Sequence, residues 1–255
     1  MQFSANLGFL WTELPLPEAI RAAKAAGFDA VECHWPYEVD SAEVKAALGE
    51  TGLTMLGLNT SRGDVAAGDN GLSALPDRTA EARAAIDQAI AYAQDINARN
   101  IHVMAGFSQG AEAHGVFVEN LKYACARAAP LGISILIEPL NHYDAPGYFL
   151  QTTEQAAALI AEVGASNLRL MFDCYHVQLM EGDLSNKLRQ LQTQIGHIQF
   201  ASVPDRGAPD HGEINFDYVF RVIKGLGFAM PLGAEYKPQG ATCETLRWLK
   251  KAQQI

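Results

Sequence analysis

LRLMFDCYH, residues 168–176, is the stretch that decides the fold. It begins with an apolar run, residues 168–172, and then changes abruptly to a carboxylate at Asp173. A short apolar run bounded by turn signals predicts a buried strand of a parallel sheet. An acid at the end of such a strand lies at the carboxyl edge of the sheet, which is where α/β barrels collect their ligands.

Three further segments end in the same way: ISILIE (residues 133–138), IGHIQF (195–200) and LGAE (232–235). They supply Glu138, Gln199 and Glu235, so four oxygen donors stand at four apparent strand ends. One ending of this kind means little. Four of them indicate a shared site at one edge of the sheet.

A recurring order of helix, glycine and short apolar strand organises the rest of the chain. It occurs in AAKAAGFDAVEC, ALGETGLTMLGLN, ARAAPLGISILIE and IKGLGFAMPLGAE. Glycine in that place is typical of a helix C-cap with positive φ, and the repeated order is typical of alternating β/α units. We therefore predict an α/β fold, a (β/α)8 TIM barrel that forms a single domain over residues 1–255. A doubly wound open sheet is the alternative, but no glycine-rich dinucleotide motif follows the first strand.

The predicted elements leave long connections after the strands and short ones before them. Strands are predicted at 3–6, 30–33, 54–59, 101–104, 133–138, 168–173, 197–200 and 232–235. Helices are predicted at 17–26, 41–48, 78–98, 113–129, 153–163, 183–194, 216–226 and 243–252. The long connections are 60–77, 105–112, 139–152 and 201–215. In a barrel these loops share a face with the four oxygen donors, so we expect function there.

Composition excludes several classes of function. The formal net charge of −10 argues against a nucleic-acid partner, which normally meets a basic surface. No apolar run approaches the roughly 20 residues of a membrane span, and the first residues lack the pattern of a signal peptide. The 4 cysteines are scattered without a CxxC pair, which favours neither a disulfide framework nor a zinc cluster. We expect a cytoplasmic protein; whether it forms a homo-oligomer stays open.

The four oxygen donors form a set that suits a hard divalent cation. Because side chains alternate along a strand, Glu138 and Asp173 can turn inward together with their neighbours at the barrel mouth. Three carboxylates and one amide oxygen, without a cysteine, favour Mg²⁺ or Mn²⁺. The alternative for each acid taken singly is a helix cap or a structural ion pair. For the four together, a metal site held by Glu138, Asp173, Gln199 and Glu235 is the better hypothesis.

Three further residues are candidates beside this set. His176 follows Asp173 by three positions, and of substrate contact, metal ligation or helix capping we favour substrate contact. Arg206 lies in the loop after Gln199; it is either a solvated surface cation or a partner for an anionic group of the substrate. Glu32 ends the second strand and is interpreted as an acid that orients a metal ligand.

Several motifs together resemble the hydroxypyruvate isomerase family, which includes 2-oxo-tetronate isomerases and belongs to the xylose-isomerase-like barrels. They are ANLGFLWTELP, AGFDAVECHWPY, GDNGLSALPDR, IHVMAG, IEPLN, FDCYH, HIQFASVPDR, GEINF and AEYKP, between Asn6 and Pro238. The resemblance implies a divalent metal on the four residues named above and proton transfer by Glu138 and Glu235. Related ketose 3-epimerases have histidine where this chain has Gln199, which favours the isomerase branch.

The resemblance implies a reaction on a small 2-keto acid. The carbonyl moves to the neighbouring carbon through a cis-enediolate, for example from hydroxypyruvate to tartronate semialdehyde, or within 2-oxo-tetronate. IEPLN is closer to the 2-oxo-tetronate group, but the sequence does not separate the two substrates. The alternatives are a ketose or keto-sugar 3-epimerase, a non-catalytic sugar-acid binding barrel and, more distantly, an abasic-site endonuclease, which would require more histidine ligands and a basic groove.

Overall fold

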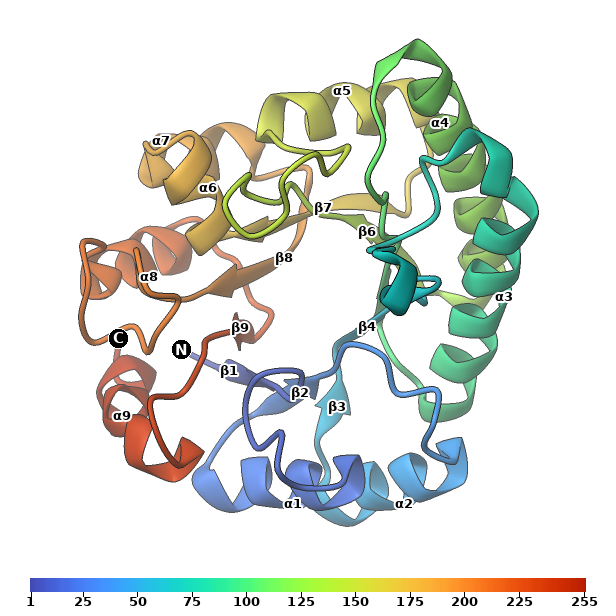
Figure 1. The fold of residues 1–255 in the computed structure, drawn as a ribbon. Helices are drawn as coiled ribbons and strands as arrows, with labels where there is room; N and C mark the ends of the chain where they lie inside the picture. The colour runs from blue at the N-terminus through green and yellow to red at the C-terminus, as the bar shows by residue number, and fades with distance from the viewer.

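Nine short parallel strands form a closed ring in the computed structural model, which describes residues 1–255 (Figure 1). The strands are β1 Phe3–Asn6, β2 Ala30–Glu32, β3 Thr54–Met55, β4 Gly57–Asn59, β5 Asn100–His102, β6 Ser134–Ile137, β7 Leu168–Asp173, β8 Ile195–Phe200 and β9 Leu232–Ala234. β3 and β4 are two halves of one segment that is interrupted at Leu56; β3 pairs with β2, and β4 pairs with β5. Since β1 pairs with β9, the ring closes with eight strand positions.

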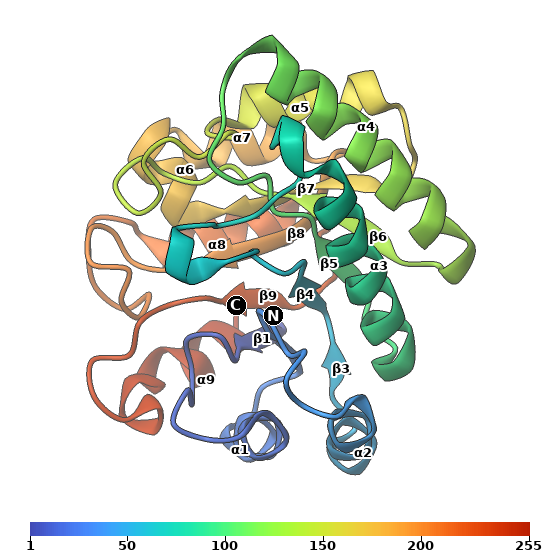
Figure 2. The ribbon, with the colours of Figure 1, turned by 45° about the vertical axis from the view of Figure 1, so that its right-hand side comes forward.

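The closed ring confirms the predicted (β/α)8 barrel and excludes the doubly wound open sheet. Helices surround it on the outside, and α3 and α4 cover the outer side of β5 and β6 (Figure 2). The helices are α1 Leu16–Ala26, α2 Ser41–Thr51, α3 Thr79–Ile96, α4 Gly110–Ala128, α5 Thr153–Val163, α6 Cys174–Met180, α7 Leu184–Leu191, α8 Phe216–Gly225 and α9 Arg247–Gln253. Short 3₁₀ turns lie at Val65–Ala67, Pro76–Arg78, Ala129–Leu131 and Thr242–Thr245.

One helix, α6, was not among the predicted helices. It begins directly after β7 because the Asp173 carboxylate accepts a hydrogen bond from the Tyr175 backbone N–H at 2.9 Å and so caps the helix. The same acid therefore ends the strand and starts the helix, with no loop residue between them. The segment after it is a separate helix, α7, which is shorter than the predicted 183–194.

Alternation along the strands separates an apolar outer layer from a polar barrel interior. Phe200 on β8 packs edge-on against Phe3 and Trp248, with ring centroids 5.8 and 5.3 Å away, in the layer between the sheet and the helices. Its neighbour Gln199 points to the opposite side of the sheet, where it is paired in register with Asp173 of β7. Alternation thus places Phe200 outside the ring and Gln199 at the inner mouth, above an interior that also holds Leu136 and Met171. None of the helices has both the length and the hydropathy needed to cross a membrane.

Candidate active site

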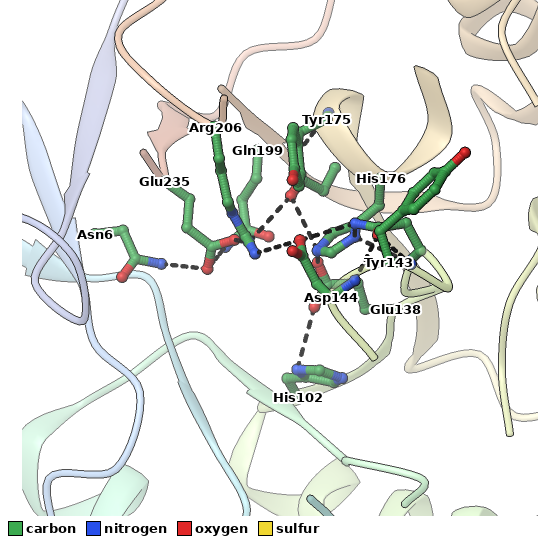
Figure 3. Close-up of polar contacts among 12 residues, drawn as sticks. Asn6, His102, Glu138, Tyr143, Asp144, Tyr175, His176, Gln199, Arg206 and Glu235 are labelled. Atoms are coloured by element: carbon green, nitrogen blue, oxygen red, sulfur yellow. Dashed lines mark hydrogen bonds and ion pairs between the residues drawn. The ribbon is translucent and has the colours of Figure 1, made fainter. Parts of the chain in front are cut away.

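The four predicted metal ligands come from four adjacent strands. Glu138 follows β6, Asp173 ends β7, Gln199 lies in β8 and Glu235 follows β9, and these strands are consecutive in the sheet. All four side chains are buried; Glu138, Gln199 and Glu235 lie together at the barrel mouth (Figure 3), and Asp173 is paired in register with Gln199. One oxygen from each of the three acids and one ring nitrogen of His176 lie within 4.8 Å of one another.

The oxygens that face the centre of this group have no hydrogen-bond partner in the protein. They are Glu138 Oε1, Asp173 Oδ2 and Gln199 Oε1. A buried oxygen without a partner is costly, because it has lost its hydration without compensation. A hard cation bound by these carboxylate and amide oxygens would remove that cost, and such oxygens are the ligands that Mg²⁺ and Mn²⁺ prefer. The residues at the mouth therefore fit a divalent ion.

His176 lies beside these oxygens, with Nε2 3.6 Å from Asp173 Oδ2 and 3.9 Å from Glu138 Oε1. Its Nδ1 lies 3.0 Å from the backbone N–H of Asn141 and 2.7 Å from the side-chain nitrogen of the same residue. A backbone N–H can only donate, so Nδ1 must accept and the ring proton must sit on Nε2. Burial, with the nearby Arg206, lowers the pKa of His176 to about 3, so the ring is neutral. A protonated Nε2 cannot bind a metal, which leaves substrate contact as the better role.

Arg206 is held inside the site and is not a solvated loop residue. Its guanidinium lies between the rings of Phe9 and Tyr175, 4.7 and 4.9 Å from their centroids. Nη2 donates to Glu235 Oε2 at 2.5 Å, and Nη1 lies 3.5 Å from Asp144 Oδ2 (Figure 3). Its backbone has a φ of +55°, and its carbonyl accepts from the Lys237 N–H at 2.7 Å. The loop therefore orients this cation toward the acids.

The surroundings of the two glutamates that the resemblance assigns to proton transfer shift their pKa values in opposite directions. Burial raises the pKa of Glu138 well above its usual value, and the charge of Glu235 raises it further. Burial also acts to raise the pKa of Glu235, but Arg206 and a hydrogen bond from His34 lower it to about 2. Burial and the charge of Glu235 thus raise the pKa of Glu138, whereas Arg206 and His34 lower that of Glu235.

His34 is a site residue that the sequence reasoning missed. Its Nε2 lies 3.0 Å from Glu235 Oε1, and its ring covers Gly8, where an added Cβ would lie only 2.2 Å from His34 Nδ1. Trp35 packs beside it, with ring centroids 4.9 Å apart, and the Arg62 guanidinium covers Trp35 at 3.9 Å. The available signal was alternation, since His34 lies two positions after Glu32 at the end of β2.

His102 also borders the site. It is buried, as expected of a core histidine, but its Nδ1 lies 3.5 Å from Glu138 Oε2 and its Nε2 has no partner. Burial lowers the pKa of His102 to about 4, so the ring is neutral and adds no charge. It therefore contacts a predicted proton-transfer residue from the side opposite Arg206 (Figure 3).

Comparison with known proteins identifies the family of the chain. Residues 20–252 match the family described as "Xylose isomerase-like TIM barrel". The chain is 45% identical to the 2-oxo-tetronate isomerase of Cupriavidus necator, over 98% of this chain and 97% of that one. It is 41% identical to the hydroxypyruvate isomerase of Escherichia coli, over 98% of both chains. The chain belongs to the hydroxypyruvate isomerase family of the xylose isomerase-like barrels.

Family membership confirms the resemblance seen in the sequence and makes this protein an enzyme of the isomerase class. A solved structure from Brucella melitensis, described as "AP endonuclease, family 2", superimposes with a TM-score of 0.95 at 38% identity, over 98% of both chains. A D-psicose 3-epimerase from Clostridium cellulolyticum shares the fold alone, with a TM-score of 0.79 at 18% identity over 98% of this chain and 92% of that one.

Proposed function

We propose that this isomerase moves the carbonyl of a small 2-keto acid, 2-oxo-tetronate or hydroxypyruvate, to the neighbouring carbon. The observation that carries the proposal is the pair of buried glutamates, Glu138 and Glu235, which approach one centre from β6 and β9. Two carboxyl groups whose surroundings separate their pKa values can act as acid and base in one reaction. The curated relatives that cover nearly the whole chain support the class of substrate.

The chemical obstacle is the removal of a proton from a carbon beside the carbonyl. One glutamate removes this proton and the other delivers a proton at the adjacent carbon. The hydroxyl proton passes to the former carbonyl oxygen, so the 2-keto acid becomes its isomer through a cis-enediolate. A Mg²⁺ or Mn²⁺ ion held by Glu138, Asp173, Gln199 and Glu235 would supply Lewis-acid stabilisation of the negative charge on the enediolate oxygens. Burial of these residues limits the access of bulk water to the proton-transfer path.

Two residues are proposed to bind the substrate. His176 donates its Nε2–H to a substrate oxygen, because the Asn141 contacts hold that proton on the side facing the acids. Arg206 receives the substrate carboxylate, with a guanidinium that the Phe9 and Tyr175 rings keep in one orientation. An acid substrate needs such a cation, because three carboxylates around a divalent ion leave a net negative charge.

The test is turnover in D₂O with saturating Mn²⁺, with products identified by NMR. Wild type should isomerise the keto acid and place deuterium on the carbon that gains hydrogen, unless a shielded base returns the same proton. Glu138→Gln and Glu235→Gln should each reduce kcat by at least about 10²–10⁴-fold, the usual contribution of general acid–base catalysis. The double variant should lose much less than the product of the two, because the groups act as a unit.

Two outcomes would contradict the proposal. Substantial turnover by the double variant with Mn²⁺ bound would remove the proton-transfer role of Glu138 and Glu235. A product whose configuration is inverted at one carbon, and whose carbonyl has not moved, would identify a 3-epimerase. Such an enzyme can use the same two carboxylates. Metal occupancy must be measured in each variant, since both substitutions also remove a carboxylate ligand.

A further inference from the structure

Glu32 lies below the site, inside the barrel, and is 3% exposed. We infer that Glu32 is a positioning residue that holds the side-chain amide of Gln199 with its oxygen toward the ion site. This inference rests on the proposed function, because it concerns the proposed metal ligand Gln199. Glu32 itself does not belong to the group of acids that could share an ion.

Both carboxylate oxygens of Glu32 are engaged by hydrogen-bond donors. Oε1 accepts from Gln199 Nε2 at 2.8 Å and from Asn6 Nδ2 at 3.1 Å. Oε2 accepts from His197 Nε2 at 2.7 Å. A carboxylate has only acceptors, so the three neighbours must all present N–H groups to it. The donors come from β1 and β8, and Glu32 from β2, so one acid joins three strands across the barrel.

This arrangement decides which end of the Gln199 amide faces the ion site. Gln199 Nε2 lies 2.8 Å from Glu32 Oε1 and 3.3 Å from Glu235 Oε1, and both of these atoms are acceptors. In the reversed orientation the amide oxygen would face two carboxylate oxygens, and its NH₂ group would face the ion site. Glu32, which makes the shorter contact, therefore keeps Gln199 Oε1 free of protein partners and available to a cation.

Gly233 on β9 makes room for this contact. A Cβ added at Gly233 would lie 2.6 and 2.8 Å from the two oxygens of Glu32 and 2.8 Å from Gln199 Cγ. A methyl group there would force the carboxylate or the amide to move. Gly233→Ala therefore disturbs the contact between Glu32 and Gln199 without changing any charge. Gly57 on β4 is the matched control, because a Cβ there meets its nearest atom at an ordinary 3.7 Å.

The test is Mn²⁺ affinity, measured from the EPR signal of free Mn²⁺, with thermal unfolding as the check on folding. Glu32→Leu should weaken Mn²⁺ binding about 10–100-fold, as expected when the partner of a metal ligand is lost. Glu32→Gln should weaken it less, because its amide oxygen can still accept from Gln199. Gly233→Ala should weaken binding in the same direction, and Gly57→Ala should stay within about twofold of wild type.

Activity gives a second readout that a purely structural role would not reproduce. If Glu32 acts through Gln199, saturating Mn²⁺ should return kcat of Glu32→Gln close to wild type, while at limiting Mn²⁺ the variant stays impaired. Should Glu32→Leu fail to fold, Glu32→Gln and Gly233→Ala decide the question.

Two results separate this inference from the proposed function. The role of Glu32 would be overturned if folded Glu32→Leu bound Mn²⁺ with the affinity of wild type, or if folded Glu32→Gln and folded Gly233→Ala both did. Either result would leave the isomerase proposal intact. Wild type that isomerises the keto acid without binding Mn²⁺ would overturn both the ion site and this inference.

Discussion

At the scale of single residues, Arg206 balances the charge of the site. Its side chain is 11% exposed and lies beside Glu235, Asp144 and Asp173, the last at 3.7 Å. Glu235 and Asp173 are buried, and burying two acids beside a single cation is tolerable only where the cation is well placed, since one unpaired buried charge costs several kcal/mol. The rings of Phe9 and Tyr175 provide that placement.

Arg206→Met should reduce kcat/KM for the keto acid by about 10–100-fold, the loss expected for a charge-assisted hydrogen bond to the substrate carboxylate. The loss should be smaller for an uncharged 2-ketose, which has no carboxylate to bind. Steady-state kinetics with both substrates check this. Arg62→Met is the control, because Arg62 also covers an aromatic ring but makes no ion pair. Equal losses for both substrates would mean that Arg206 supports the loop rather than binding the acid.

Much of this residue-level picture could be predicted from strand ends and alternation. Glu138, Asp173, Gln199 and Glu235 do converge, although their roles remain predictions. The proton position on His176 could not be predicted, because it depends on Asn141, a partner 35 positions away along the chain. The burial of Arg206 between two rings was equally invisible, since Phe9 and Tyr175 are distant from it in sequence.

At the scale of elements, the loop after β8 is held by a pair of polar side chains. Asp205 Oδ1 accepts from Ser202 Oγ at 2.6 Å, and Asp205 Oδ2 accepts from His211 Nε2 at 2.8 Å. Partial burial acts to raise the pKa of Asp205, but these hydrogen bonds lower it to about 2. The hydrogen bond to Asp205 raises the pKa of His211. Asp205 and His211 thus hold together the short turn that carries Arg206.

The pair should make the stability of the protein depend on pH. The contribution of Asp205 is present above an unfolded pKa of about 4 and is lost as the pH falls toward 2. The contribution of His211 is present below about pH 6.5 and is lost as the pH rises through its raised pKa. Both contributions to stability are therefore present between about pH 4 and 6.5. Because the two groups are partly exposed, they stabilise the folded state by less than about 1 kcal/mol.

Urea unfolding of wild type and His211→Gln at several pH values measures this. The difference in unfolding free energy should be largest near pH 5 and should shrink as the pH rises through the raised pKa of His211. A difference that stays constant from pH 5 to 9 would show that the charge of His211 is not involved. His114→Gln is a control, since His114 pairs with Glu162 on the helical surface, far from this loop in sequence.

Element boundaries were less predictable than element types. The eight strand positions and most helices follow from apolar periodicity and from glycine C-caps such as Gly27, with a φ of +94°. α6 was missed because β7, its capping residue Asp173 and the start of α6 follow one another within residues 172–175. No loop-like residues therefore mark the end of the strand and the start of the helix. The split of the third strand at Leu56 was missed because Met55 and Leu56 are adjacent apolar residues and no polar residue or proline marks a break there.

At the scale of the whole molecule, the site joins acids from β6, β7 and β9, which lie far apart in the sequence, so an ion there should stabilise the barrel. Chelation should lower Tm and abolish turnover, and Mg²⁺ or Mn²⁺ should restore both. At an ion concentration of 100 times Kd, the expected stabilisation is about 2.7 kcal/mol, because the ion binds only the folded site. Differential scanning fluorimetry with an activity assay measures the two effects together.

Asp173→Asn provides the control, since it should fold yet respond only weakly to the ion. Retention of full turnover in a preparation shown by elemental analysis to be metal-free would contradict the metal prediction. Closure of the barrel itself was predictable from the alternating pattern, because eight β/α units with short αβ connections bring the first and last strands together.

The stack of Arg62, Trp35 and His34 beside Glu235 has an optical consequence. Of the 3 tryptophans, Trp11 and Trp248 are buried at 3% and 5% exposure, whereas Trp35 is partly exposed and contacts a histidine that touches the site. Indole emission responds to the polarity and charge around the ring, so a ligand that changes the His34 contact should alter the intrinsic fluorescence mainly through Trp35. Binding of a non-reacting keto-acid analogue would then be visible without turnover, and Trp35→Phe would remove the signal.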